Sequence, residues 1–190
     1  MKNGKIILAS SSPRRKEILE KMGLEFEIVA SDYEEILENS DFTYEKIEEL
    51  AYHKAKVVAD KSFLPHPILS ADTVVVIEGE ILGKPKDETD AISMLKRLSG
   101  NKHFVVTSIC VINPTNSTKK LSSTTSYVEF EFLDEKTIKD YVEKFKPLDK
   151  AGAYGIQELP DGFIKNIEGS FENIIGLCPR AVQDILSQRP

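Results

Sequence analysis

Short apolar runs and one helical pattern alternate at the start of the chain. Residues 5–9 form an apolar run that is typical of a buried strand. A helix is predicted to begin at Pro13, with Ser12 as its N-cap, and to end near Met22, where a glycine follows. Residues 25–30 predict a second strand. The first thirty residues therefore predict the order strand, tight turn, helix, strand.

The next part of the chain predicts a long helix followed by a hairpin. Apolar residues recur at helical spacing over residues 43–60. Another strand begins at Ile68, and residues 74–82 predict a hairpin that turns at Glu78 and Gly79. Residues 70–73 are thereby predicted to lie between two apolar strands.

Long β-type runs dominate the second half. They cover residues 103–112 and 122–133, and the turn-rich residues 113–120 separate them. Further elements are predicted at residues 87–98, 134–145 and 179–186 as helices and at residues 163–167 as a strand. Strands and helices alternate first, and long antiparallel-type strands follow, which predicts an α/β fold with a mixed sheet. Two lobes with a cleft between them are compatible with this pattern, although periodicity alone does not establish them.

Composition narrows the functional class. The chain has 190 residues, 41% of them hydrophobic and 29% charged, and a formal net charge of −6. This length and composition fit one globular domain over residues 1–190. A net negative charge argues against general nucleic-acid or membrane-surface binding, so an anionic ligand would need cations gathered locally. The two cysteines and three scattered histidines form no disulfide framework or zinc pattern, and the start has no signal peptide, so the cytoplasm is the expected location.

Residues 10–15 are a candidate anion site. A strand runs through small polar residues into a helix start, where free N–H groups and the helix dipole favour an anion. Arg14 and Arg15 in the first turn oppose that dipole unless an anion binds, and Arg15 shares a face with Leu19 and Met22 and should point inward. A capped surface helix with two solvated arginines remains an equal alternative.

Two further charged residues stand in apolar surroundings. Lys54 falls on the apolar stripe of the predicted helix, where it either extends its ammonium past the edge of the core or reaches into a cleft to meet phosphate. Asp72 lies between apolar strands, where it is satisfied by backbone N–H groups in a turn, binds metal or lines a cleft. Lys84, in the turn at residues 83–85, is a weak signal by itself.

The segment at residues 149–157 is rich in small residues. Gly152 and Gly155 would permit close backbone approach to a flat ligand, although a flexible loop has the same composition. The sequence has no nucleotide-binding glycine motif and no nucleophile elbow. Oxygen ligands without His or Cys clusters point to Mg²⁺ or Mn²⁺ if a metal binds.

These pieces together closely resemble the Maf family, which are nucleoside triphosphate pyrophosphatases also called septum-formation inhibitors. The matching segments occur in the family's order over nearly the whole chain: residues 8–15, 34–35, 53–55, 71–74, 83–85, 98–100 and 149–157. The resemblance implies a cleft between two α/β lobes of the inosine triphosphate pyrophosphatase type, a divalent metal and release of pyrophosphate.

The resemblance also implies roles for individual residues. Substrate-binding candidates, which hold the phosphates or lie on the nucleotide side, are Ser10, Ser12, Arg14, Arg15, Lys54, Thr73, Lys84 and Gln157. Asp72 would activate the attacking water and contact the metal, and Glu35 would help to bind the metal. The partner would be a nucleoside triphosphate, without nucleic acid or membrane, and a homodimer is left open.

Within the family, the sequence resembles the branch associated with dTTP and UTP. That branch has Ser-Pro-Arg-Arg, Ala-Asp-Thr and Ala-Tyr-Gly-Ile-Gln, all of which occur here, whereas the branch associated with 7-methyl-GTP differs at all three places. Residues 158–161 depart from the family's more Gly-rich continuation. The resemblance to this branch implies a role in nucleotide-pool housecleaning, with a link to arrest of cell division.

Two other function classes are alternatives to this hydrolase. A non-catalytic nucleotide-binding regulator of septum formation would have the same fold, but the retained Asp72 beside the cations disfavours it. A haloacid-dehalogenase-type phosphatase would need aspartates at positions 70 and 72, and position 70 is Ser70.

Overall fold

A single mixed sheet organises the protein. The computed structural model describes residues 5–33, 41–61 and 65–187. The sheet has seven strands in the order β2-β1-β3-β5-β6-β7, with β4 paired to β3. The strands are β1 (Ile6–Leu8), β2 (Phe26–Ile28), β3 (Ile68–Ile77), β4 (Glu80–Leu82), β5 (Lys102–Asn113), β6 (Thr118–Phe130) and β7 (Ile164–Glu168). Strand β1 pairs in parallel with β2 and β3, and the other pairs are antiparallel, which confirms the predicted α/β fold with a mixed sheet.

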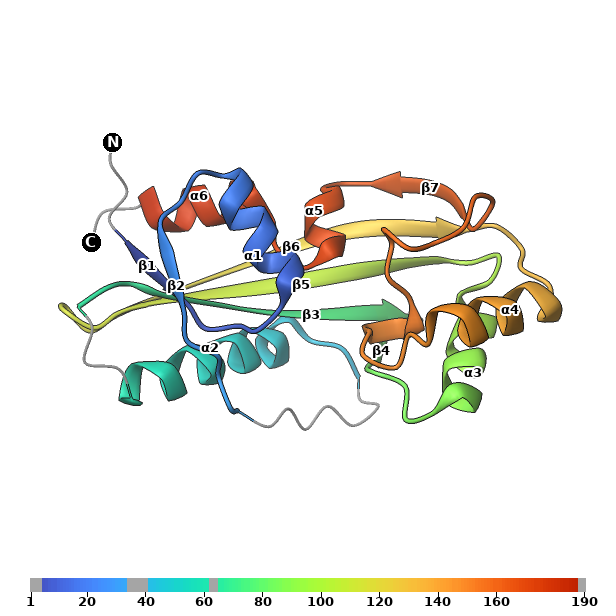
Figure 1. Ribbon diagram of the computed structural model, residues 1–190, viewed down its shortest axis with the longest axis horizontal. Coiled ribbons are helices and arrows are strands. Elements are labelled where there is room, and N and C mark those ends of the chain that lie inside the picture. The colour runs from blue at the N-terminus through green and yellow to red at the C-terminus, as the bar shows by residue number, and fades with distance from the viewer. Residues whose placement is uncertain (1–4, 34–40, 62–64, 188–190) are drawn as a thin grey trace.

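The helices pack on both faces of this sheet. They are α1 (Pro13–Lys21), α2 (Tyr44–Lys61), α3 (Glu88–Leu98), α4 (Glu135–Phe145), α5 (Phe171–Ile175) and α6 (Pro179–Ser187), with a 3₁₀ turn η1 (Ala151–Ala153). Figure 1 shows α2 below the long strands, α1, α5 and α6 above them, and α3 and α4 together at the other end of the molecule.

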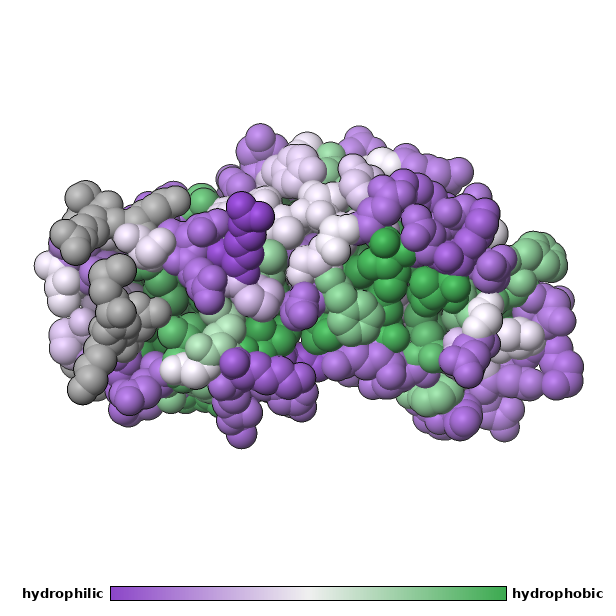
Figure 2. All heavy atoms as spheres, turned by 90° about the horizontal axis from the view of Figure 1, so that it is seen from above, coloured by the Kyte–Doolittle hydropathy of each residue, from purple (hydrophilic) through white to green (hydrophobic). Residues whose placement is uncertain are grey.

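The core is divided between the two ends of the sheet. At one end, α3, α4 and η1 pack on the strands around Phe130 and Tyr141. At the other end, separate apolar clusters lie beneath α1 and α6 and above α2, with β1 between them. The molecule is long in one direction (Figure 1). Each end forms a lobe with its own apolar clusters. Seen from above in Figure 2, its surface is largely polar, and apolar residues show between polar ones along the long axis.

Strand β3 corrects one prediction from the sequence. Residues 70–73 do not separate two strands but lie inside one continuous strand, which pairs with β5 from Ile68 opposite Ile112 to Val76 opposite Phe104. The long antiparallel partner keeps this segment extended despite its polar residues. Because side chains alternate along a strand, Asp72 and Thr73 point to opposite faces of the sheet.

The ends of several other elements also differ from the predictions. Strand β6 begins at Thr118 and ends at Phe130, so the turn is shorter than the predicted residues 113–120 and residues 131–133 are outside the strand. Helix α5 was not predicted, because its five residues are too few to show a period. The predicted caps of α3 and α4 are confirmed, whereas the side chain of Ser12 makes no capping hydrogen bond at α1. No helix in the described residues is long and apolar enough to cross a membrane.

Candidate active site

The candidate site lies at a gap along one edge of β3. On that edge, β1 pairs with Ile68 and Leu69, and β4 pairs with residues 75–77. Among the described residues, no strand pairs with residues 70–74 on this side. Strand β1 leaves the sheet here and leads into α1, so the gap is bordered by the start of that helix. Side chains from both faces of β3 can therefore reach one cavity.

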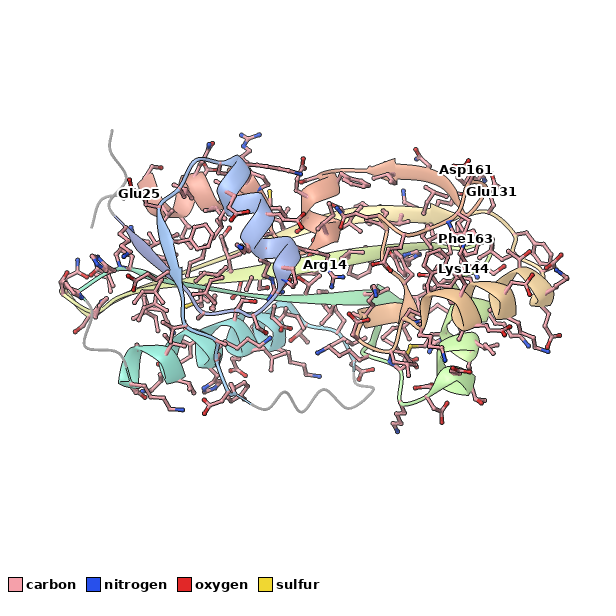
Figure 3. All side chains as sticks on the ribbon, in the orientation of Figure 1. Arg14, Glu25, Glu131, Lys144, Asp161 and Phe163 are labelled. Carbon is pink, nitrogen blue, oxygen red and sulfur yellow. The ribbon has the colours of Figure 1, made fainter. Side chains whose placement is uncertain are left out.

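A cavity of about 660 Å³ lies at this gap. Its wall includes every substrate-binding candidate named from the sequence: Ser10, Ser12, Arg14, Arg15, Lys54, Thr73, Lys84 and Gln157. Asp72 lies in the same wall. Arg14 stands at the start of α1, near the middle of the molecule (Figure 3). Five separate segments of the chain thus converge on one place, although their individual roles remain proposals.

Glu35 is the one site residue that cannot be placed. It was predicted to help bind the metal and lies outside the described residues. The described segment before it ends at Tyr33, which lines the cavity.

Lys54 and Asp72 form an ion pair inside the protein. The ammonium of Lys54, from α2, contacts Oδ1 of Asp72, and the two side chains are only 10% and 4% exposed. Lys54 therefore does not extend its ammonium past the core into solvent, which was one alternative from the sequence. A buried carboxylate is costly unless it is paired, so this contact explains how Asp72 is accommodated inside β3.

Arg15 connects three parts of the site. Its guanidinium donates to Oγ of Ser10 at 3.1 Å, to Oγ1 of Thr73 at 3.1 Å and to the carbonyl of Gly176 at 3.0 Å. The prediction that Arg15 points inward is confirmed. Thr73 is also within 2.9 Å of Oγ1 of Thr107, on β5. The guanidinium thus holds α1 against β3 and the end of α5, and it fixes two candidate substrate-binding hydroxyls.

The cavity gathers positive charge that the chain as a whole lacks. Among the described residues, five cationic side chains line it, namely Arg14, Arg15, Lys54, Lys84 and Lys150, against the four acidic residues Glu17, Asp72, Asp149 and Glu158. The described part of the wall thus has one more cation than anions, whereas the whole chain carries a net charge of −6. Such a local gathering of cations in an acidic protein is what the composition required for an anionic ligand.

Residues 149–151 and 154–158 also line the cavity. One of them, Lys150, is a residue that the sequence did not single out. Lys150 is buried, and its ammonium lies 2.9 Å from Oδ1 of Asp149 and 3.3 Å from Oε2 of Glu158. Burial acts to raise the pKa of Asp149, but the hydrogen bond and charge of Lys150, together with a backbone hydrogen bond and the charge of Arg14, outweigh it, so this pKa lies below its ordinary value. A lysine in a Gly-rich segment has no periodic pattern around it, so its burial could not be predicted.

The two glycines of this segment approach the protein's own side chains. A Cβ added at Gly152 would lie 2.9 Å from Cγ2 of Val75, and Gly152 also has a positive φ of 66°. A Cβ at Gly155 would lie 2.9 Å from Cε of Lys150. One interpretation from the sequence was that these glycines permit close approach to a flat ligand, and the other was a flexible loop. The close approach that the structure shows is to Val75 and Lys150.

The described residues fit a divalent metal of the Mg²⁺ type only in part. No cluster of three or more His, Cys, Asp or Glu side chains that could hold a metal occurs within the described ranges. Mg²⁺ usually binds through one or two carboxylates, water and substrate phosphates, so such a cluster is not required. The carboxylate of Asp72 in the cavity wall is a donor of the right chemistry.

A buried histidine supports the cavity wall from behind. His103 lies 2.8 Å from the hydroxyl of Tyr154, which lines the cavity, and both are buried. Burial lowers the pKa of His103 from 6.5 to about 4. The histidine therefore stays neutral in the folded protein at pH values where the unfolded chain binds a proton.

We expect this histidine to make the protein acid-sensitive. Its contribution to stability is complete above pH 6.5 and is lost as the pH falls towards 4, by up to about 3 kcal/mol. In a His103→Gln variant this contribution is absent, so its free energy of unfolding should fall less between pH 7 and pH 4.5 than that of the unchanged protein. Urea unfolding at several pH values measures the difference, and parallel curves for the two proteins would contradict it.

The geometry describes a cavity in which cationic side chains gather around the buried carboxylate of Asp72. Comparison with known proteins places the chain in a family. The sequence matches the family described as Maf-like protein over residues 5–189, and the chain belongs to the Maf family.

Its relatives include proteins named dTTP/UTP pyrophosphatase. One from Ruminiclostridium cellulolyticum is 49% identical over 173 residues, which cover 90% of this chain and 89% of the relative. One from Geobacillus sp. is 44% identical and covers 95% and 96% of the two chains. One from Clostridioides difficile is 42% identical and covers 96% and 94%.

Among solved structures, a HAM1 protein from Coxiella burnetii has a TM-score of 0.48 at 20% identity, covering 66% of this chain and 72% of that one. A nucleoside-triphosphatase, dITP/XTP pyrophosphatase, from Mycobacterium abscessus has a TM-score of 0.47 at 17% identity, covering 67% and 74%.

Proposed function

We propose that this chain hydrolyses dTTP and UTP to the nucleoside monophosphate and pyrophosphate. It is a nucleoside triphosphate pyrophosphatase, a hydrolase of the α–β phosphoanhydride bond. Its relatives are named for the same activity, dTTP/UTP pyrophosphatase. The observation that carries the proposal is the single cavity in which Asp72 and five cationic side chains meet. Its size, about 660 Å³, is in the range of small-molecule sites.

The cations neutralise the triphosphate. A triphosphate carries about four negative charges, which repel an incoming water, and positioned cations in a partly enclosed site reduce that repulsion most in the transition state. Arg14, from the start of α1, and Lys84, from the turn after β4, would contact the phosphates, while Ser10, Ser12 and the start of α1 offer hydroxyl and N–H donors. Arg15 acts partly by fixing the hydroxyls of Ser10 and Thr73.

Asp72 is the proposed general base. The water oxygen bonds to the α phosphorus, the bond from that phosphorus to the bridging oxygen breaks, and pyrophosphate leaves. Asp72 accepts the proton that the water loses. Lys54 contacts Asp72 and lines the same cavity, and its ammonium is proposed to contact the triphosphate as well.

A divalent cation, Mg²⁺ or Mn²⁺, is part of the proposal. Asp72 would contact it, together with substrate oxygens and Glu35, and the cation would supply further neutralisation of phosphate charge. What the described residues contribute themselves is the cationic wall and the buried carboxylate.

Pyrimidine preference is proposed to depend on Gln157. Uracil and thymine present an acceptor, a donor and an acceptor in sequence, whereas cytosine presents a different pattern. A side-chain amide can donate and accept at once, and Gln157 is exposed in the cavity wall, where it can do so. A site built on hydrogen bonds rejects a wrong pattern because its polar groups are left unpaired.

Gln157→Ala is therefore expected to reduce the preference for UTP over CTP by roughly tenfold or more, the scale of a lost hydrogen bond to a base. Turnover of saturating UTP should fall less than this ratio, because the phosphate-binding residues are unchanged. Steady-state kinetics with both nucleotides check the prediction, and an unchanged ratio would show that Gln157 does not recognise the base.

Product analysis tests the proposed reaction. Purified protein is incubated with UTP and either Mg²⁺, Mn²⁺ or a chelator, and the products are separated. We expect equal amounts of UMP and pyrophosphate with metal and almost none with chelator. UDP with free phosphate would instead indicate a phosphatase, and absence of any product with bound nucleotide would support the alternative, a non-catalytic regulator of septum formation.

The phosphatase alternative also has a structural objection. The aspartate pair of that class would occupy positions 70 and 72, but Ser70 is fully buried and its hydroxyl donates to the carbonyl of Ala51. It therefore cannot act on a substrate in the cavity. The cellular role that we propose is removal of unwanted pyrimidine nucleotides in the cytoplasm, with an effect on septum formation as a consequence.

A further inference from the structure

The segment that carries Gln157 is held in place by contacts on each side. The backbone N–H of Gly152 donates to the carbonyl of Gly83 at 3.0 Å, next to Lys84. The hydroxyl of Tyr154 bonds to His103 at 2.8 Å. These contacts fix residues 152–154. The backbone N–H of Gly155 also donates to the hydroxyl of Tyr141 at 3.4 Å, and Ile156 packs against the apolar core, so Gln157 follows directly after the anchored part of the segment.

Gln157 itself lies in a turn that ends at Glu158. The backbone N–H of Glu158 donates to the carbonyl of Gly155 at 2.8 Å, which closes the turn. The carboxylate of Glu158 then reaches back to the ammonium of Lys150, at 3.3 Å. This contact joins the two ends of the segment and is adjacent in the chain to Gln157.

Lys150 is built into the segment. Its side chain is 9% exposed, and its stem lies against Gly155 so closely that a Cβ there would be 2.9 Å from Cε and 3.0 Å from Cδ. The ammonium also lies 2.9 Å from Oδ1 of Asp149. Because an ammonium is costly to bury without a partner, the conformation that keeps these carboxylate contacts is favoured.

The ion pair between Lys150 and Glu158 therefore has one member at each end of the segment that carries the proposed base-recognising residue.

We propose that Lys150 and Glu158 are a pair of positioning residues that fix Gln157 and thereby set the preference of this enzyme for uracil and thymine. The inference rests on the proposed function and on the role of Gln157 in it. Neither residue is proposed to touch the reacting atoms, and Lys150, whose ammonium is paired with Asp149 and Glu158, adds only to the charge of the cavity wall. Their loss lets the turn move, so that Gln157 no longer distinguishes the hydrogen-bonding pattern of uracil from that of cytosine.

The test compares Glu158→Gln, Lys150→Met and the double variant with the unchanged protein. Glu158→Gln removes the charge of a side chain that is 41% exposed, so it should fold. Lys150→Met keeps an apolar stem against Gly155. The same Lys→Met change at Lys165, whose exposed ion pair with Glu129 joins β7 to β6, is the matched control.

For each protein, kcat and KM are measured with UTP and CTP. We expect the ratio of kcat/KM values, UTP over CTP, to fall at least fivefold in Glu158→Gln and at least as much in Lys150→Met, mainly through a higher KM for UTP, the scale of about 1 kcal/mol. The double variant should show no larger loss than Lys150→Met alone, because both changes remove one contact. Lys165→Met should keep the original ratio.

A ratio within twofold of the unchanged protein in Glu158→Gln would overturn the inference, as would losses that multiply in the double variant. Binding of non-hydrolysable α,β-methylene analogues of UTP and CTP gives the same ratio without catalysis. If the unchanged protein releases no pyrophosphate, the proposed function fails. The analogue-binding ratio of Glu158→Gln then still tests the positioning role by itself.

Discussion

Replacing Asp72 by asparagine is expected to reduce turnover of UTP by about a hundredfold or more. Loss of a general base typically costs this much, because an amide cannot accept the proton of the attacking water. Asparagine has nearly the same shape and keeps an oxygen that can accept from the ammonium of Lys54. Affinity for the nucleotide should therefore be largely retained, so the effect appears in kcat.

The control for this variant is the same substitution at Asp140, whose carboxylate is exposed on α4 and pairs with Lys136 one turn away. Asp140→Asn should leave turnover unchanged, since surface ion pairs of this kind contribute little. Thermal unfolding of both variants shows whether they are folded. Near-normal turnover in a folded Asp72→Asn protein would remove Asp72 from the proposed reaction.

The second large effect is expected at Lys54. Changing it to methionine keeps the apolar stem but removes the ammonium beside a buried carboxylate, which typically costs about 3 kcal/mol of stability. Activity should fall as well, because the same ammonium is proposed to contact the triphosphate. Lys84 offers the comparison, since it is exposed in the same cavity. Lys84→Met should weaken activity without a comparable loss of stability.

A double variant separates the two effects of Lys54. In Lys54→Met with Asp72→Asn, neither member of the buried pair is charged, so stability measured by urea unfolding should recover much of what Lys54→Met lost. Activity should stay as low as in Asp72→Asn. If Lys54→Met is fully active, the ammonium serves the fold and not the substrate, and if the double variant is no more stable than Lys54→Met, the pair is not the source of the instability.

The sequence predicted the parts of the fold that local pattern determines. Apolar periodicity located α2, and the aspartate caps located the starts of α3 and α4 within one residue. The hairpin turn at Glu78 and Gly79 is also confirmed, and both residues have positive φ. These signals come from residues that are close in the chain, which is why they could be predicted.

What the sequence did not show depends on partners that are distant in the chain. The strand β3 continues through Asp72 because β5 pairs with it. The residues next to 70–73 in the sequence do not reveal that partner, because β5 lies about thirty residues or more further along the chain. The same holds for Lys150, whose burial follows from Glu158 and Gly155 folding back over it. The roles inferred from the resemblance remain predictions, since the shared cavity shows that the residues meet but not what each one does.

The most direct test of the central proposal is a comparison of five nucleotides with the unchanged protein. The value of kcat/KM is measured for dTTP, UTP, CTP, ATP and GTP with Mg²⁺, and pyrophosphate is quantified as the product. We predict that dTTP and UTP are hydrolysed at least tenfold more efficiently than the other three, each yielding one pyrophosphate per monophosphate. Equal values for UTP and CTP, a preferred purine, or free phosphate in place of pyrophosphate would contradict the account.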